Sequence, residues 1–209
     1  MGSITDRKET ELVKQIQKGD GSALGQLLSS YQQRIYHTCY RMVNNAETAS
    51  DLTQETFAKV IEGIGSFKGN SSFGTWITRI AMNETISFLR KSKHRNAVSL
   101  DKDQLRQDGS VALKALLSSR REPPPSSGVE REEEIEQLVE SIDELEVELR
   151  TVIVLRDLQE MDYKQIADVL NIPVGTVKSR LFRARLHLRQ ILLKKAFENH
   201  QREGAVAHG

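Results

Sequence analysis

The sequence contains a single cysteine, Cys39, so an intramolecular disulfide is excluded. Its apolar surroundings in the stretch IYHTCYRM predict a small buried residue rather than a reactive thiol. No apolar run approaches the ~20 residues that a membrane-spanning helix needs, and the amino terminus lacks the apolar core of a secretory signal. We therefore expect a cytoplasmic protein that makes no membrane contact of its own.

Signals of enzymes and metal proteins are equally scarce. The sequence shows no phosphate-binding glycine loop and no nucleophile placed beside a base. The histidines do not follow the spacing of metal ligands, and they stand at His37, His94, His187, His200 and His208. The sequence therefore predicts a protein that is not an enzyme and that holds neither a metal ion nor a cofactor.

Proline is rare as well, and three of the four prolines form one run at 123–125. The run lies in a stretch without sustained periodicity apart from VALKALL, which predicts a flexible linker over 96–133. On both sides apolar residues recur every three or four positions, and alternating β-branched runs are absent. The sequence therefore predicts an all-α fold with two small helical domains, at 10–95 and 134–195, and a disordered tail at 196–209.

Charge is unevenly distributed although the formal net charge is only +1. Residues 130–161 carry nine more acidic than basic side chains, whereas residues 162–209 carry five more basic than acidic ones. Between Asp168 and Glu198 there are seven lysine and arginine side chains and no carboxylate. Charge segregated in this way indicates binding partners of different sign.

A helix-turn-helix is predicted near the carboxyl end. Asp162 is a suitable N-cap for a short helix through Leu170, and Asn171 can adopt the left-handed conformation of a turn. Pro173 then suits the start of a second helix, expected over 174–193. The second helix of such a motif fits the major groove of DNA.

The predicted second helix has one apolar face and one cationic face. At ~100° per residue, an inward stripe comprises Val177, Leu181, Ala184, Leu188 and Ile191. The opposite face carries Lys178, Ser179, Phe182 and Arg183, flanked by Arg180 on one side and by Arg185 and Arg189 on the other. Arginine or lysine in such positions can donate to guanine O6 and N7, which favours base readout over a merely solvated basic face.

Two separated parts of the chain resemble one protein family. The stretch 149–189, LRTVIVLRDLQEMDYKQIADVLNIPVGTVKSRLFRARLHLR, resembles region 4 of bacterial sigma factors in the extracytoplasmic-function (ECF) group of the sigma-70 family. The stretches DLTQETFAKV (51–60) and FKGNSSFGTWITRIAMNETISFLRK (67–91) resemble region 2 of the same group. The resemblance implies a transcription initiation factor that binds core RNA polymerase, recognises −10 and −35 promoter elements and promotes DNA opening. An anti-sigma factor is implied as a further partner.

The resemblance also implies roles for individual residues. Core polymerase binding falls on Asp51, Gln54 and Glu55. The residues implied to capture an unstacked −10 base are Asn83, Arg79 and the loop residues Asn70, Ser71, Ser72 and Phe73. The residues implied to contact the adjacent phosphates are Arg90, Lys91, Lys93 and Arg95. Readout of the −35 element falls on Lys178, Ser179 and Arg183, with Arg180 and Arg185 at phosphates or in helix packing.

Two departures from the family pattern and two rival interpretations remain open at this point. Leu145 and Glu146 replace the Leu-Pro that usually precedes the second region 4 helix, so the boundary there could be a continuous helix. The proline run leaves the path of the linker undefined. A stand-alone helix-turn-helix regulator would bind operator DNA without polymerase, and an anti-sigma adaptor would bind through the acidic stretch 130–148.

Overall fold

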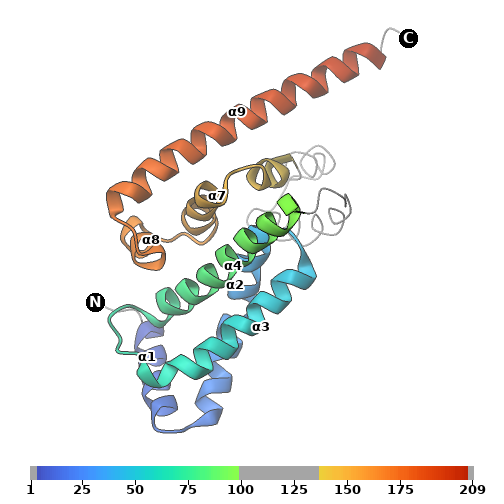
Figure 1. Cartoon of the computed structure of the whole chain (residues 1–209). Coiled ribbons are helices and arrows are strands. Elements are labelled where there is room, and N and C mark those ends of the chain that lie inside the picture. Colours follow the sequence, from blue (N-terminus) through green and yellow to red (C-terminus); the bar gives the residue numbers. More distant parts are fainter. Residues whose placement is uncertain (1–3, 99–136, 207–209) are drawn as a thin grey trace, which may run out of the picture.

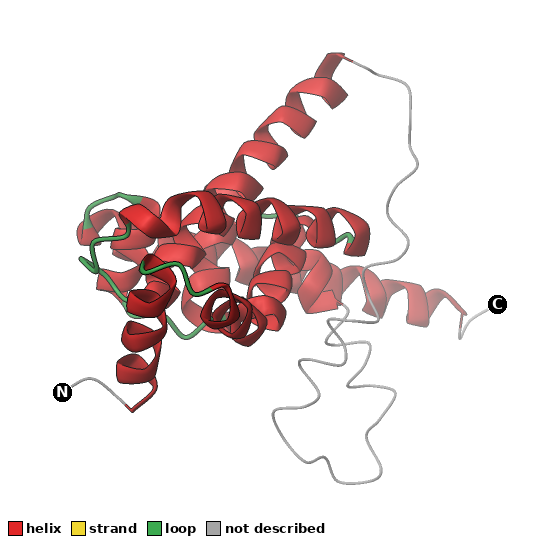
Figure 2. Ribbon diagram, turned by 90° about the horizontal axis from the view of Figure 1, so that it is seen from below, coloured by secondary structure: helices red, strands yellow, loops and turns green. Residues whose placement is uncertain are grey.

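The structure, a computed structural model, describes residues 4–98 and 137–206. The first part contains α1 (Ile4–Gln17), α2 (Gly21–Val43), α3 (Ala46–Gly63), the short 3-10 helix η1 (Ile64–Ser66) and α4 (Phe73–Val98). The second part contains a helical segment at 137–143, α7 (Val147–Ile153), the π-helical turn η2 (Val154–Leu158), α8 (Tyr163–Leu170) and α9 (Val174–Val206). Neither described part contains a strand (Figure 2), which confirms the all-α prediction.

Local side-chain chemistry explains where the amino-terminal helices begin. Asp20 accepts hydrogen bonds from the backbone N–H groups of Ser22 and Ala23, and so caps α2. The left-handed Asn44 (φ 49°) ends the same helix, and the Asn45 side chain accepts from the Thr48 N–H to cap α3. The chain therefore reverses direction within two residues, which places α2 and α3 side by side (Figure 1).

The two domains have separate cores. The core of the first domain lies among α1 to α4 and is centred on fully buried Leu27, Ile35 and Ile77. The second core is formed by α7, η2, α8 and α9, and its fully buried members include Leu155, Ile166 and Val177. The prediction of two helical domains is confirmed.

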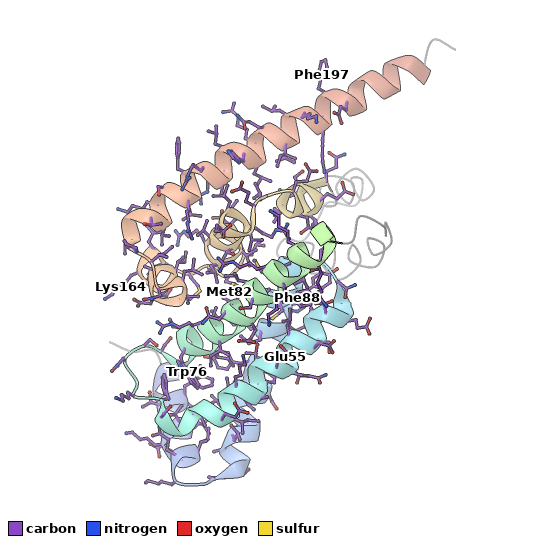
Figure 3. The ribbon with its side chains drawn as sticks, viewed as in Figure 1. Glu55, Trp76, Met82, Phe88, Lys164 and Phe197 are labelled. Atoms are coloured by element: carbon purple, nitrogen blue, oxygen red, sulfur yellow. The ribbon has the colours of Figure 1, made fainter. Side chains whose placement is uncertain are left out.

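Two methionines of the first domain belong to the core of the second. Met42 of α2 and Met82 of α4 are fully buried against residues of α7 to α9. Met82 lies on the side of α4 that faces α7 and α8 (Figure 3). The two domains are thus packed against each other through apolar contacts, with α8 lying directly on α4 (Figure 1).

Buried polar contacts reinforce this packing. The Arg150 guanidinium donates to the carbonyl oxygens of Met42 (2.7 Å), Asp143 and Leu145, and forms an ion pair with Asp143 (3.2 Å). Arg41 donates to the carbonyl oxygen of Leu158 at 3.1 Å. The bonds from Arg150 to Met42 and from Arg41 to Leu158 join the two domains and depend on the packed arrangement, whereas Asp143 and Leu145 lie in the same domain as Arg150.

The boundary around residues 145 and 146 is a break between two helices. The segment at 137–143 ends in a turn, and α7 begins at Val147. Leu145 is buried in the second core, while the Leu149 and Arg150 N–H groups donate to the carbonyl of Glu146. The chain therefore forms a helix pair here without the usual proline.

The last helix of each domain extends beyond its predicted end. The linker prediction lies outside the described residues from 99 onward, and α4 continues through Val98. The tail predicted to be disordered from residue 196 is helical as far as Val206, where α9 ends. The disorder prediction is wrong for that part of the tail.

Candidate nucleic-acid interface

The helix-turn-helix forms as its local chemistry predicts. Asp162 accepts from the Gln165 N–H at 2.8 Å, and the Gln165 side chain accepts from the Asp162 N–H at 2.8 Å, which completes a capping box at the start of α8. Asn171 is left-handed (φ 51°) and ends the helix. Pro173 then accepts the first backbone bonds of α9, from Thr176 and Val177.

One face of α9 is buried by this motif and the opposite face is free. Val177, Leu181 and Ala184 are at most 3% exposed, as the periodicity predicted. Lys178, Ser179 and Arg183 are exposed on the other side. Among the described residues no protein segment covers this part of α9 (Figure 1), so it can enter a groove of DNA.

Phe182 lies at the centre of the same face and is 71% exposed. The sequence placed it on the outward face but assigned it no role. A large exposed aromatic ring between Ser179 and Arg183 is costly in water, and phenylalanine can pack against the thymine methyl group in the major groove. The sequence did hold a signal for such a role, because Phe182 is an apolar side chain outside the inward stripe.

The two flanking arginines differ from each other. Arg185 forms an ion pair with Asp157 of η2 (2.7 Å), and this hydrogen bond raises the pKa of its guanidinium above the ordinary value. Arg180 is half-buried on the opposite flank. Arg185 is thus paired within the protein. Neither Arg180 nor Arg185 lies on the central outward face that carries Arg183.

The second candidate surface runs along α4. Asn83 is exposed, and Arg79 lies one turn before it with a half-buried side chain whose Nε has no hydrogen-bond partner in the described structure. Arg90 forms an exposed ion pair with Glu148 of the second domain (3.3 Å). Lys91 and Lys93 are exposed near the carboxyl end of the helix. α4 therefore carries an amide and several cations, which do not all lie on one face, since Lys91 is ~100° around the helix from Arg90.

The loop before α4 contains two residues with structural roles. The Ser72 hydroxyl accepts from the Thr75 N–H (3.1 Å) and so caps α4. Phe73 is only 3% exposed and packs its ring against Tyr31, Phe67 and Trp76. Asn70 is exposed, Ser71 is half-buried, and Ser72 is exposed although its hydroxyl is engaged in the cap.

A cleft of about 260 Å³ separates this loop from α1. Its lining combines apolar and polar side chains: Glu9, Thr10, Val13, Lys14, Gln17, Phe67, Lys68, Gly69, Ser71, Ser72 and Phe73. Asn83 is not among them, since ten residues of α4 separate it from Phe73, or about 15 Å of helix. The structure thus does not bring Asn83 and the loop into one site.

The predicted polymerase-binding residues lie on α3, away from both surfaces. Asp51, Gln54 and Glu55 are all exposed, and Figure 3 shows Glu55 on the outer side of α3. Gln54 also borders a groove of about 520 Å³ between α2 and α3. Tyr36, His37 and Phe57 line the same groove and were not predicted from the sequence.

The burial of Cys39 agrees with the prediction from the sequence. Cys39 is fully buried, and burial raises the pKa of its thiol, which makes it unreactive. Within residues 4–98 and 137–206, no three histidine, cysteine or acidic side chains are grouped so as to hold a metal ion. None of the helices described has the length and apolar character to cross a membrane.

Comparison with known proteins gives the same two regions. The family model "Sigma-70 region 2" matches residues 27–95, and the model "Sigma-70, region 4" matches residues 135–188. The RNA polymerase sigma-H factor of Pseudomonas aeruginosa is 35% identical over 187 residues, which cover 87% of this chain and 92% of the relative. The ECF RNA polymerase sigma factor SigW of Bacillus subtilis is 36% identical over 183 residues, which cover 86% and 94% respectively.

Solved structures show that the fold is shared. A structure of CnrH in complex with the cytosolic domain of CnrY aligns with a TM-score of 0.62 at 20% identity, over 88% of this chain and 97% of that one. The sigma factor RpoE of Bartonella quintana, in complex with the anti-sigma factor NepR, aligns with a TM-score of 0.60 at 20% identity, over 80% and 95%. With both regions matched and full-length relatives above 30% identity, the chain belongs to the extracytoplasmic-function group of the sigma-70 family of RNA polymerase sigma factors.

Proposed function

We propose that this sigma factor, bound to core RNA polymerase, recognises the −35 element through α9 and the −10 element through α4 and its preceding loop, and promotes DNA opening. The observation that carries the proposal is the two-sided α9. Val177, Leu181 and Ala184 on its apolar face are buried, and Leu188 and Ile191 are partly buried. Lys178, Ser179, Phe182 and Arg183 form an uncovered face at its amino-terminal half. That is the geometry of a recognition helix in the major groove.

The proposed −10 contacts need side chains that bind an extruded base and side chains that bind the phosphates beside it. An extruded base loses stacking and pairing worth a few kcal/mol, which a site fitted to the single strand must offset. Asn83 can both donate to and accept from a base edge. The exposed Lys91 and Lys93, together with the half-buried Arg79, can hold the flanking phosphates.

Core polymerase is proposed to bind the exposed side of α3. Asp51, Gln54 and Glu55 lie there beside the α2–α3 groove, whose apolar lining includes Tyr36 and Phe57. Polar side chains around an apolar groove are typical of a protein–protein contact. Since two structural neighbours are complexes with the cytosolic domain of CnrY and with the anti-sigma factor NepR, we also propose an anti-sigma partner for this chain. A protein with this role acts in the cytoplasm.

Run-off transcription with purified bacterial core polymerase tests the proposal. Fragments of the source genome serve as templates, with and without the protein. Promoter-specific transcripts that appear only on its addition, and that fade with Asn83→Ala or Arg183→Ala, are the expected result. A protein that binds duplex DNA alone, but neither joins core polymerase nor starts transcripts, would instead be a stand-alone regulator.

Arg183→Ala is expected to weaken recognition of one −35 base pair by ~1–3 kcal/mol, because a bidentate contact to a base edge is lost. Binding of the holoenzyme to wild-type and single-base −35 variants measures this. Lys194→Ala, which removes an equal charge from the exposed far half of α9, should weaken binding to all sequences alike. An equal loss with Arg183→Ala on scrambled DNA would refute base readout at this position.

Glu55→Lys is expected to weaken binding to core polymerase by about tenfold or more, because it reverses a charge on the proposed contact surface of α3. Fluorescence anisotropy of the labelled protein titrated with core polymerase measures the affinity. Glu11→Lys makes the same change at an exposed position of α1 and should leave the affinity unaltered. If Glu55→Lys and Glu11→Lys bound core polymerase with equal affinity, α3 would not be part of the polymerase contact.

A further inference from the structure

We propose that α1 forms one wall of the site that receives the unstacked −10 base, and that the Glu9 carboxylate discriminates against thymine there. The inference rests on the proposed function, because it assumes that the loop before α4 captures a base of the nontemplate strand. It adds a residue outside the stretch 27–95 that matches the region 2 family model. No sequence motif pointed to this residue.

The size and the mixed lining of the cleft between α1 and the loop suit a small ligand such as one base. Its volume of about 260 Å³ lies just below the ~300–1,000 Å³ of pockets that hold drug-sized ligands. Val13, Phe67 and Phe73 provide apolar surface, and Glu9, Lys14 and Ser71 provide polar groups in the lining. A base can lie against the apolar residues while its edge meets the polar ones.

The wall and the loop are held together before any base arrives. The Gln17 side chain at the end of α1 donates to the carbonyl oxygens of Phe67 (2.9 Å) and Ile64 (3.2 Å). These bonds tie α1 to both ends of the turn that leads into the loop. A site formed in advance loses less entropy when it binds a ligand.

The Glu9 carboxylate is also oriented in advance. The Tyr31 hydroxyl donates to Glu9 Oε1 at 2.9 Å, and Tyr31 itself is only 6% exposed. Gly74 lies so close that a Cβ there would be 2.9 Å from this hydroxyl, so the tyrosine has little room to move. One carboxylate oxygen is thereby engaged, and the other can accept a hydrogen bond from a base.

An ionised carboxylate accepts hydrogen bonds but cannot donate them. Cytosine and adenine present an exocyclic amino group, and guanine presents adjacent N–H groups, to such an acceptor. Thymine presents a single N–H between two carbonyl oxygens, both of which would face the negative charge. Lys14, on the same helix as Glu9 and in the same lining, can donate to a ring acceptor of the favoured bases. Thymine is therefore the base that fits worst.

Glu9→Gln tests the inference because the amide keeps the shape, still accepts from Tyr31, and can donate to a thymine carbonyl. Run-off transcription is measured with each of the four bases at every nontemplate −10 position. For the wild-type holoenzyme we expect one position at which thymine lowers transcription about tenfold, as one hydrogen bond to a charged group implies. Glu9→Gln should reduce this penalty to less than about threefold, and the matched variant Glu11→Gln should retain it.

The outcomes separate the inference from the proposed function. An unchanged thymine penalty in Glu9→Gln, or an equal change for all four bases, overturns the role of Glu9. If Ser71→Ala alters base preference while Glu9→Gln does not, the loop binds the base without α1. If the wild-type protein starts no promoter-specific transcripts with core polymerase, the proposed function itself fails. Tyr31→Phe, which frees the carboxylate but keeps its charge, should give an intermediate penalty.

Discussion

Cross-linking the two domains in the packed arrangement is expected to lower promoter-specific transcription about a hundredfold. Elements centred about 25 base pairs apart lie roughly 85 Å apart along B-form DNA, at 3.4 Å per base pair. In the structure α8 lies directly on α4, and helices in contact are 8–10 Å apart. If α9 and α4 recognise these elements as proposed, the packed protein cannot reach both at once, and the domains must separate to bind a promoter.

Arg34→Cys combined with Gln159→Cys allows this experiment. The Arg34 Nε and the Gln159 Oε1 lie 3.3 Å apart across the domain boundary, and neither residue belongs to a proposed binding surface. The native Cys39 does not compete, because it is fully buried. A dimaleimide with a reducible disulfide joins the pair, and run-off transcription is compared before and after reduction.

Recovery of transcription on reduction distinguishes a locked protein from a damaged one. Each single-cysteine variant, treated with the same reagent, should keep wild-type activity. Full transcription by the cross-linked protein would show that the packed arrangement is compatible with promoter binding, and the model of domain separation would then be wrong.

The helix-turn-helix could be predicted almost residue by residue because its signals are local. Asp162 and Gln165 bond to each other's backbone, and Asn171 accepts the left-handed turn, whatever the rest of the chain does. The inward stripe of α9 was equally clear, since a single helical face had to be buried. The placement of Phe182 opposite that stripe followed from the same periodicity.

Helix ends that depend on weak signals were less predictable. Ser72 was assigned to a binding loop, yet its hydroxyl caps α4 through the Thr75 N–H. The carboxyl end of α9 was assigned to a disordered tail because chain ends are often poorly ordered. Its lysine, alanine, glutamate and glutamine residues are good helix formers, and no proline interrupts them before Val206.

The packing of one domain on the other left almost no trace in the sequence. Met42 and Met82 are apolar residues in amphipathic helices, and periodicity cannot tell which neighbour covers them. The cleft lined by α1 was missed for the same reason, because its walls come from segments about 55 residues apart. Arg41 and Arg150 were the available signal, because Arg41 lies between buried Tyr40 and Met42 and Arg150 follows buried Leu149.

Arg150→Met is expected to lower the free energy of unfolding by about 3 kcal/mol, because it leaves buried acceptors without their donor. The Arg150 side chain is 12% exposed, and burial lowers the pKa of its guanidinium, although arginine stays charged in proteins. Without the guanidinium, the carbonyl oxygens of Met42, Asp143 and Leu145 would lose a hydrogen-bond donor, and the Asp143 carboxylate would lose its ion-pair partner. The melting temperature should fall by about 6–12 °C.

Arg90→Met provides the matched control, since Arg90 also joins the two domains through an ion pair, with Glu148 at 3.3 Å. Its side chain is 68% exposed, so water replaces the lost contact and the expected cost is below about 1 kcal/mol. Thermal and urea unfolding of both variants measure the difference. Similar small effects for the two would mean that the Arg150 contacts are not maintained in solution. A large effect for Arg150→Met alone would show that the buried Arg150 contacts, most of them within the second domain, stabilise the protein more than the exposed ion pair does.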